Sequence, residues 1–241
     1  MSIKDQRIED LLSSYDSVGN LIDKNIDLKM ADLMNSRSFF LNESINEKKP
    51  KPREVDVYAI LSGISFYKES QEFIKKIILQ LENILQEEIF YFVSQENLGV
   101  EYAVIKWPDD SYDQELIKNS KKFLDQWKGD PFCLRIVGIQ IHIDGCIVLK
   151  GVDLGSEIYE FRKMLFSKVT GLPVKQSSWA HIPLGRVLAP VGEEKMKQLK
   201  ALIGNLNRNL VHDVLIDKIH MVNEKRWYME EKNYLHTKLL K

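Results

Sequence analysis

The spacing of apolar residues along the chain changes from helical to strand-like near residue 54. Up to Leu41, apolar side chains recur every three or four positions, which predicts a helical N-terminal extension over residues 1–41. Residues 42–54 are polar, charged and contain two prolines, so they are predicted to form a linker. The alternating and helical patterns that follow predict a folded domain over residues 55–225. The C-terminal tail, residues 226–241, is aromatic and charged, and its pattern leaves its form open.

Within the domain, strand-like and helical segments follow one another in the same order twice. Strand patterns cover residues 55–66, 89–93, 99–107, 132–144, 146–149, 180–187 and 214–223. Helical patterns cover residues 69–86, 109–127, 156–168 and 193–206. We therefore expect an α+β fold of pseudo-twofold, duplicated strand–helix–strand–helix units, with antiparallel sheets around a central groove and helices outside.

Composition and charge narrow the class of protein. Hydrophobic residues make up 44% of the chain and charged residues 29%, as in ordinary globular proteins. The formal net charge of -1 provides no global attraction to nucleic acid or to an anionic membrane, so binding of a polyanion would need a local patch. No apolar run approaches the ~18 residues of a membrane span, and the N-terminus lacks an apolar leader core. We expect a cytoplasmic protein that does not enter a membrane.

No motif for a metal or a cofactor is found. Cys133 and Cys146 lie in apolar, strand-like runs and are predicted to be buried free thiols. The chain has no CxxC or Cys/His spacing of the zinc type, no GxGxxG, no phosphate-binding loop of the Walker type and no nucleophile elbow. We therefore expect neither a metal nor a cofactor.

The most informative segment is His181-Ile182-Pro183-Leu184-Gly185-Arg186-Val187. It resembles the second signature of the 2H phosphoesterase superfamily, in the His-x-Thr-Leu-Gly-Arg-Val form of the RNA 2′,3′-cyclic phosphodiesterases, also called 2′-5′ RNA ligases. The resemblance covers the order of elements from about Val55 to Asn223, whereas only this segment matches closely in residues. It implies hydrolysis of a cyclic phosphodiester by two histidines, one accepting and one donating a proton.

Three of the four side chains that the resemblance requires are missing. In the second motif His181 is present, but Pro183 stands where the hydroxyl residue is expected and has neither a hydroxyl nor an N–H. In the first motif Gly99 stands for the histidine and Glu101 for the hydroxyl residue. A carboxylate there repels a phosphate by about 1 kcal/mol at ~4 Å, even in a water-like dielectric. The alternative is a changed chemistry in which Glu101 and His181 act as an acid/base pair.

Four more residues are candidates for ligand binding. Arg186 follows the motif histidine and either neutralises a phosphate or forms a structural ion pair. His142 lies on the polar face of a strand that either lines the groove, where His142 replaces the missing imidazole, or faces solvent. Tyr102 and Trp179 flank the groove strands and either stack on a base or pack in the core.

Our first hypothesis is therefore a 2H-phosphoesterase-like protein with a degenerate catalytic site that binds a nucleotide or an RNA end in its groove. The second is a protein-interaction module with a vestigial groove, which contacts a protein partner through its N-terminal extension. The third is a divergent phosphodiesterase that uses Glu101 and His181. A groove filled by side chains, with Glu101 paired to Arg186, favours the second hypothesis over the first.

Overall fold

The computed structural model describes residues 3–23 and 27–241, so residues 1–2 and 24–26 of the expected N-terminal extension lie outside the described residues. The helices are α1 (Ile3–Asp23), α2 (Met30–Arg37), α3 (Lys68–Leu85), α4 (Gln114–Gln126), α5 (Glu157–Lys168) and α6 (Glu193–Asn207), with short 3-10 helices η1 (Gln95–Asn97) and η2 (Trp227–Met229). The strands are β1 (Glu54–Gly63), β2 (Phe90–Phe92), β3 (Gly99–Lys106), β4 (Phe132–Ile141), β5 (Cys146–Asp153), β6 (Ile182–Val187), β7 (His212–Ile216), β8 (Lys218–Arg226) and β9 (Glu231–Leu239).

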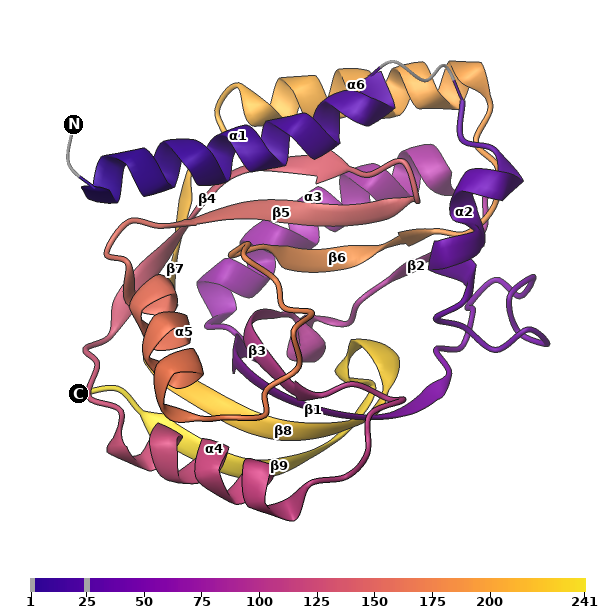
Figure 1. Ribbon diagram of the computed structural model, residues 1–241. Coiled ribbons are helices and arrows are strands. Elements are labelled where there is room, and N and C mark those ends of the chain that lie inside the picture. The colour runs from indigo at the N-terminus through magenta and orange to yellow at the C-terminus, as the bar shows by residue number, and fades with distance from the viewer. Residues whose placement is uncertain (1–2, 24–26) are drawn as a thin grey trace.

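The strands form two antiparallel sheets, which confirms the expected α+β fold (Figure 1). One sheet has the order β3-β1-β8-β9 and the other the order β2-β6-β5-β4-β7. The two halves of the chain exchange strands: β2, from the first half, pairs with β6, while β8, from the second half, pairs with β1. This exchange ties the two halves together and leaves the sheets facing each other.

The helices cover the outside of the sheets, because each has one apolar face. In Figure 1, α1 and α6 run along the outer face of the five-stranded sheet, where both contact β4. The apolar stripe predicted for α3 is buried in the core, namely Ile74, Ile77, Ile78, Leu81 and Leu85. Burying one such aliphatic side chain stabilises the fold by roughly 1.5–3 kcal/mol relative to leaving it exposed.

Several element boundaries differ from the sequence prediction, and two of the differences have a clear physical reason. The helix expected from residue 109 begins at Gln114, because the Asp113 carboxylate caps it by accepting from the N–H groups of Glu115 (2.9 Å) and Leu116 (3.0 Å). The strand expected over residues 214–223 is two strands in different sheets, β7 and β8, which meet at Asp217. A pattern of apolar residues does not reveal where a continuous strand passes from one sheet to the next.

The terminal segments contact the body of the protein. Tyr15 of α1 is fully buried, and its hydroxyl donates to the carbonyl of Gly151 at 3.1 Å. Ile45, in the expected linker, is 5% exposed. The C-terminal segment, whose form the sequence left open, is strand β9, which pairs with β8. These contacts show that the described terminal segments pack against the body of the protein. The division of the chain into extension, linker, domain and tail stays a prediction.

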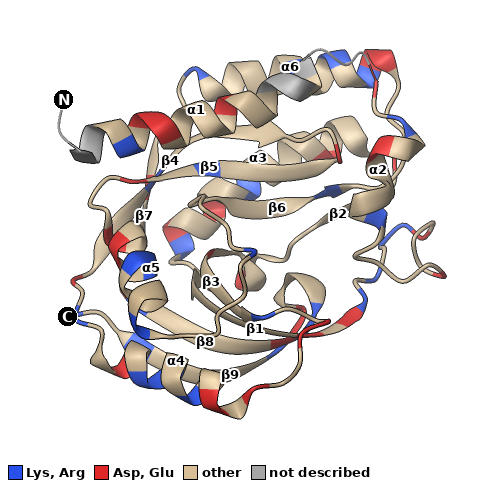
Figure 2. Cartoon of the chain, in the orientation of Figure 1, with Lys and Arg blue, Asp and Glu red and all other residues tan. Residues whose placement is uncertain are grey.

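Charged side chains of both signs are spread over the helices, the loops and the strands (Figure 2). Within the described part of the chain, no helix is both long and apolar enough to cross a membrane. Both cysteines are free, but only Cys146 is buried; Cys133 is exposed, and the expectation that both are buried was wrong for it. The reason is alternation: Leu134, next to Cys133 on β4, takes the inward-facing position.

Candidate functional site

A central pocket of about 360 Å³ lies where the two sheets face each other, and both motif segments line it. Gly99 and Glu101 reach it from β3, while His181 and Pro183 reach it from the start of β6. The i, i+2 spacing places both members of each motif on one face of a strand, as predicted. The four positions that the sequence singled out therefore converge on one cavity.

Arg162 of α5 fixes the distance between the two motif segments. Its guanidinium is largely buried and donates to the carbonyls of Tyr102 (2.8 Å), Glu101 (2.7 Å) and Trp179 (2.7 Å). Two of these carbonyls belong to β3 and the third to the segment just before His181. A planar guanidinium with a fixed fork of donors suits such a three-point clamp. This role of Arg162 was not predicted from the sequence, because an arginine on a helix is usually solvated.

The first motif has no space for a side chain at Gly99. A β-carbon built there lies 2.8 Å from the carbonyl oxygen of Ser62 and 3.0 Å from Cδ1 of Leu61. Glu101 is partly buried, and burial raises the pKa of its carboxyl above the ordinary value, while the nearby Arg162 opposes the shift. Its carboxylate forms no ion pair with the described residues.

His181 is the one histidine among the described residues that line the pocket. Burial, together with the neighbouring His142, Arg162 and Arg186, lowers the pKa of its imidazole to about 4, so the ring is neutral at pH 7. Its Nδ1 atom is buried and has no hydrogen-bond partner among the described residues. The side chain is therefore able to accept or donate one hydrogen bond to a ligand, but it does not carry a charge near neutral pH.

Arg186 lines the pocket but is already bound to the protein. It donates to the hydroxyls of Tyr228 and of Ser36 (2.7 Å) and to the carboxylate of Asp144 (3.1 Å). Its guanidinium also lies over the ring of Phe39, 4.3 Å from the centroid. Of the two roles expected for Arg186, these contacts favour the structural ion pair, although its partner is Asp144 and not Glu101.

Three predicted site residues lie outside the central pocket. Tyr102 follows Glu101 and so points to the other face of β3, where it is 1% exposed, bonds Ser62 (2.9 Å) and packs on Phe161. Trp179 packs against Tyr15, with ring centroids 4.6 Å apart, and lines a separate hollow of about 220 Å³ beside α1. Tyr102 is thus a core residue, and Trp179 is covered by α1.

His142 lies behind Trp179 rather than in the pocket. Its Nε2 atom is 2.8 Å from Nε2 of Gln140, and its ring meets Trp179 edge-on with centroids 5.6 Å apart. Burial lowers the pKa of His142, with Asp144 opposing the shift. The His142 ring is close enough to His181 to affect its pKa, yet it is not among the described lining residues of the cavity.

A second acidic residue, Glu224 of β8, was not predicted from the sequence. It lines the pocket, is 5% exposed, and accepts a hydrogen bond from the N–H of Met229 at 2.9 Å. Burial, with a further contribution from Glu101, raises the pKa of this carboxyl to about 7. The signal was the alternation of Val222 and Glu224, but the predicted strand ended one residue too early to include it.

Aromatic side chains form the walls of the pocket. They are Phe39, Trp107, Trp227 and Tyr228, and Met229 and Leu61 add apolar surface. Lys175 is exposed at the rim, with its ammonium 5.2 Å from the centroid of the Trp107 ring. The cavity is therefore mainly apolar, and its polar groups include two carboxyl groups, one neutral imidazole and the Lys175 ammonium at the rim.

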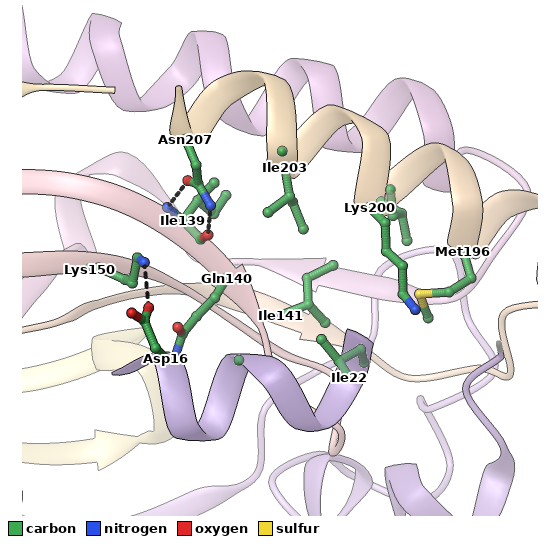
Figure 3. A pocket seen from close by; sticks show the side chains of 13 residues that line it. Asp16, Ile22, Ile139, Gln140, Ile141, Lys150, Met196, Lys200, Ile203 and Asn207 are labelled. Carbon is green, nitrogen blue, oxygen red and sulfur yellow. Dashed lines mark hydrogen bonds and ion pairs between the residues drawn. The ribbon is translucent and has the colours of Figure 1, made fainter. Parts of the chain in front are cut away.

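A further hollow of about 210 Å³ lies on the outer face of the five-stranded sheet, between α1 and α6 (Figure 3). Its polar groups bind one another: Lys150 pairs with Asp16 (3.4 Å), and the Asn207 amide bonds the N–H and carbonyl of Ile139 at 2.7 and 2.9 Å. None of the predicted site residues lines it. Across the described residues, no group of three or more His, Cys, Asp or Glu side chains is placed to hold a metal ion.

Neither the protein-family models nor the curated proteins give a match to this sequence. Solved structures do match. The apo form of E. coli LigT shares 15% identity over 78% of this chain and 99% of its own, with a TM-score of 0.50. TT0787 of Thermus thermophilus shares 11% identity over 76% and 97%, with a TM-score of 0.52. The protein of unknown function ATU0111 from Agrobacterium tumefaciens shares 13% identity over 82% and 89%, with a TM-score of 0.56. These similarities show a 2H-phosphoesterase-like fold.

Proposed function

We propose that this protein, which has a 2H-phosphoesterase-like fold, is a ligand-binding protein that has lost the two-histidine hydrolysis of cyclic phosphodiesters. The observation that carries the proposal is a single cavity of about 360 Å³ that both motif segments line but that contains one imidazole. Two imidazoles are needed for one to accept and the other to donate a proton. Binding needs only the cavity.

The motif residues that remain are those that the fold needs. Leu184 and Val187 are fully buried, and a β-carbon at Gly185 would lie 2.1 Å from the carbonyl oxygen of Tyr91 on the neighbouring strand. Arg186 binds Ser36 and Asp144. The hydroxyl that would contact a phosphate is absent at Pro183, and this difference supports retention of the fold without the chemistry.

At the first motif, the packing around Gly99 supports a loss of the catalytic histidine, because the neighbouring strand now occupies the space that its side chain would need. Because the carbonyl of Ser62 and the side chain of Leu61 occupy the space next to Gly99, a histidine would require β1 to move. Restoring one residue type would therefore not restore the site.

The alternative of a phosphodiesterase that uses Glu101 and His181 has one supporting observation, since both residues line the same cavity. The second carboxyl, Glu224, counts against it, because two carboxylates disfavour a phosphate anion. This alternative predicts a rate that depends on the ionisation of both Glu101 and His181.

An interaction module with a vestigial groove has less support. The groove is open, and Arg186 pairs with Asp144 and not with Glu101. A protein partner bound through the N-terminal extension stays a prediction, and the described contacts of Tyr15 and Phe39 are directed at this chain.

A nucleotide or RNA end is one candidate for the ligand of the central pocket. The observation in its favour is a crystal structure of E. coli LigT complexed with 3′-AMP, which matches this chain with a TM-score of 0.50 and 15% identity. In this chain a nucleotide phosphate at the motif positions would meet Glu101 where the resemblance expects a hydroxyl.

The test is hydrolysis of 2′,3′-cyclic nucleotides and 2′-5′-linked oligonucleotides by the wild-type protein and by His181→Ala. We expect no turnover by either protein. Turnover by the wild type that His181→Ala abolishes would overturn the proposal, and a similar loss in Glu101→Gln would favour the divergent phosphodiesterase.

A further inference from the structure

Two carboxyl groups that line the central pocket form no ion pair with any described residue. Glu101 and Glu224 come from different strands, β3 and β8, and both line the cavity. Neither carboxylate lies within 4.0 Å of a lysine, arginine or histidine nitrogen of the described residues. Glu224 accepts from the backbone N–H groups of the turn at Tyr228 and Met229, whereas Glu101 has no hydrogen-bond donor from the described chain.

Apart from Lys175, the cations near these two carboxyl groups are engaged by other partners. Arg162 binds three backbone carbonyls, and Arg186 pairs with Asp144. Lys232 of β9 donates to the side chain of Asn97 (2.6 Å) and to the carbonyl of Met229 (3.0 Å). Lys175 is exposed at the rim, where solvent screens it.

The walls have the chemistry that binds cations. An ammonium or guanidinium group is attracted to the face of an aromatic ring within about 6 Å. Two walls already show this contact inside the protein: Lys175 lies 5.2 Å from the Trp107 centroid, and Arg186 lies 4.3 Å from the Phe39 centroid. Trp227 and Tyr228 complete the same aromatic lining.

The turn at Tyr228 and Met229 forms one wall of the cavity. Tyr228 and Met229 both have positive φ, 65° and 57°, which non-glycine residues rarely adopt. The turn is held in this form by Glu224, which accepts from the Met229 N–H, and by Arg186, which donates to the Tyr228 hydroxyl. Here the turn places Trp227, Tyr228 and Met229 on the cavity wall.

We propose that the central pocket binds a small organic cation, with its protonated amine directed to Glu101 and Glu224 and its apolar part against the aromatic walls. This inference rests on the proposed function, because it names the ligand class of the same cavity. An ammonium group supplies the counter-charge that both carboxylates lack, and an N–H donor for Glu101, which accepts no hydrogen bond from the described chain. A phosphate ester would add a third negative group to the same space.

The proposal makes a distinctive prediction about protons. Glu224 has a pKa raised to about 7 by burial, and the pKa of Glu101 is raised by burial as well. The charged groups that face them are Arg162 from α5 and Lys232 from β9, with Glu96 and Glu230 beside Lys232. A bound cation favours the ionised carboxylates, so its binding at pH 7 releases protons, whereas binding of an anion takes protons up.

The experiment is isothermal titration calorimetry of the full chain with benzylamine, its neutral analogue benzyl alcohol, and 3′-AMP, in two buffers that differ in ionisation enthalpy. We expect benzylamine to bind at least about tenfold more tightly than benzyl alcohol, with release of protons at pH 7. Glu101→Gln and Glu224→Gln should each bring this ratio close to one. Glu224→Gln keeps a side-chain oxygen that accepts from Met229, so the turn is expected to stay folded. Glu72→Gln, an exposed residue of α3, is the matched control and should leave the ratio unchanged.

Each outcome decides between the two proposals. Equal binding of benzylamine and benzyl alcohol, or proton uptake on binding, would overturn the cation site. Binding of 3′-AMP without a preference for benzylamine would overturn the cation site alone and leave the ligand-binding proposal standing. If no probe binds, both proposals fall. Hydrolysis of a cyclic phosphodiester that depends on His181 would overturn the proposed function. The ratio of the affinities for benzylamine and benzyl alcohol would still decide whether the pocket prefers a cation.

Discussion

The packing of β1 against β3 leaves no space for a side chain at Gly99. The two strands pair Gly63 with Gly99, and a β-carbon at position 99 would be 2.8 Å from the Ser62 carbonyl oxygen. Contacts this short force the backbone or its neighbours to shift. The residue at the first motif position is therefore constrained by the fold as well as by the chemistry.

Replacing Gly99 by alanine should consequently destabilise the protein by about 1–3 kcal/mol, the usual cost of overpacking. Gly204 in α6 is the matched control, because a β-carbon there meets nothing within 4 Å. Gly204→Ala should stabilise the protein by roughly 0.5–1 kcal/mol, since alanine is the better helix former. Urea denaturation measures both changes, and equal effects at the two glycines would contradict the crowding argument.

The raised pKa of Glu224 links stability to pH. Burial raises this pKa from 4.5 to about 7, so between these values the folded state holds a proton that the unfolded chain has released. Stability from this group is therefore lost as the pH rises from about 4.5 through 7. Glu224→Gln removes the effect, and its stability relative to the wild type should rise by up to about 3 kcal/mol between pH 5 and pH 8.

The pKa shifts of two histidines change the stability with pH in the opposite direction. Burial lowers the pKa of His181 and of His220 to about 4, so their contributions to stability increase as the pH rises from about 4 to 6.5. Both histidines remain in Glu224→Gln, and their effect cancels when variant and wild type are compared at each pH. Urea denaturation at pH 5 and pH 8 gives the comparison, and a constant difference would mean that Glu224 does not titrate in this range.

At the scale of elements, Arg162 joins α5, β3 and the segment before β6. Its guanidinium satisfies three buried carbonyls, and each hydrogen bond from a charged donor contributes more than a neutral one. Removing the side chain leaves these oxygens without a donor in a dry environment.

Arg162→Met should therefore cost about 3–5 kcal/mol, and Arg162→Lys should recover only part of it because an ammonium lacks the planar fork. Lys163→Met is the control on the same helix, since Lys163 is exposed and pairs only with Glu160 at 3.9 Å among the described residues. Its effect should stay within about 0.5 kcal/mol. Thermal and urea denaturation of the three variants measure the difference, and a loss in Lys163→Met as large as in Arg162→Met would contradict the clamp.

The elements that the sequence predicted well have a regular apolar period. The stripe of α3 and the i, i+2 positions of β3 and β6 were readable because burial repeats every 3.6 or 2 residues. The pairing of distant strands was not readable. Glu224 reaches the pocket because β8 pairs with β1 in the sheet of the other half of the chain, and no local pattern encodes this partner.

The same limit explains why the sequence left alternatives open at single residues. Tyr102 was expected either to stack on a base or to pack in the core, and alternation turns it into the core beside Phe161. Trp179 was expected to flank an open groove, whereas Tyr15 of the N-terminal helix covers it. A contact between residues 15 and 179 depends on the tertiary fold and has no signature in either segment.

At the scale of the whole molecule, the N-terminal helix packs onto the five-stranded sheet. Tyr15 is fully buried, and Arg7 donates to the carbonyl of Asp153 at 2.6 Å. Phe39, after α2, forms part of the pocket wall. These contacts make the described part of the N-terminal segment a component of the structure that shapes the site.

Tyr15→Ala should accordingly destabilise the whole protein by about 3–5 kcal/mol, the range for removing a buried aromatic side chain. Tyr159→Ala, at a tyrosine that is 45% exposed, should cost less than about 1 kcal/mol. Far-UV circular dichroism and tryptophan fluorescence should report one coincident transition. Separate transitions would indicate that the N-terminal helix unfolds independently of the sheets.

The central claim is that the pocket binds without hydrolysing, and single-turnover phosphorus NMR tests it most directly. With the full chain in excess over 2′,3′-cyclic AMP, even slow chemistry that a multiple-turnover assay misses would become visible. We predict that the cyclic phosphate resonance persists unchanged with the wild type and with His181→Ala. A phosphomonoester resonance that grows with the wild type and not with His181→Ala would contradict the account.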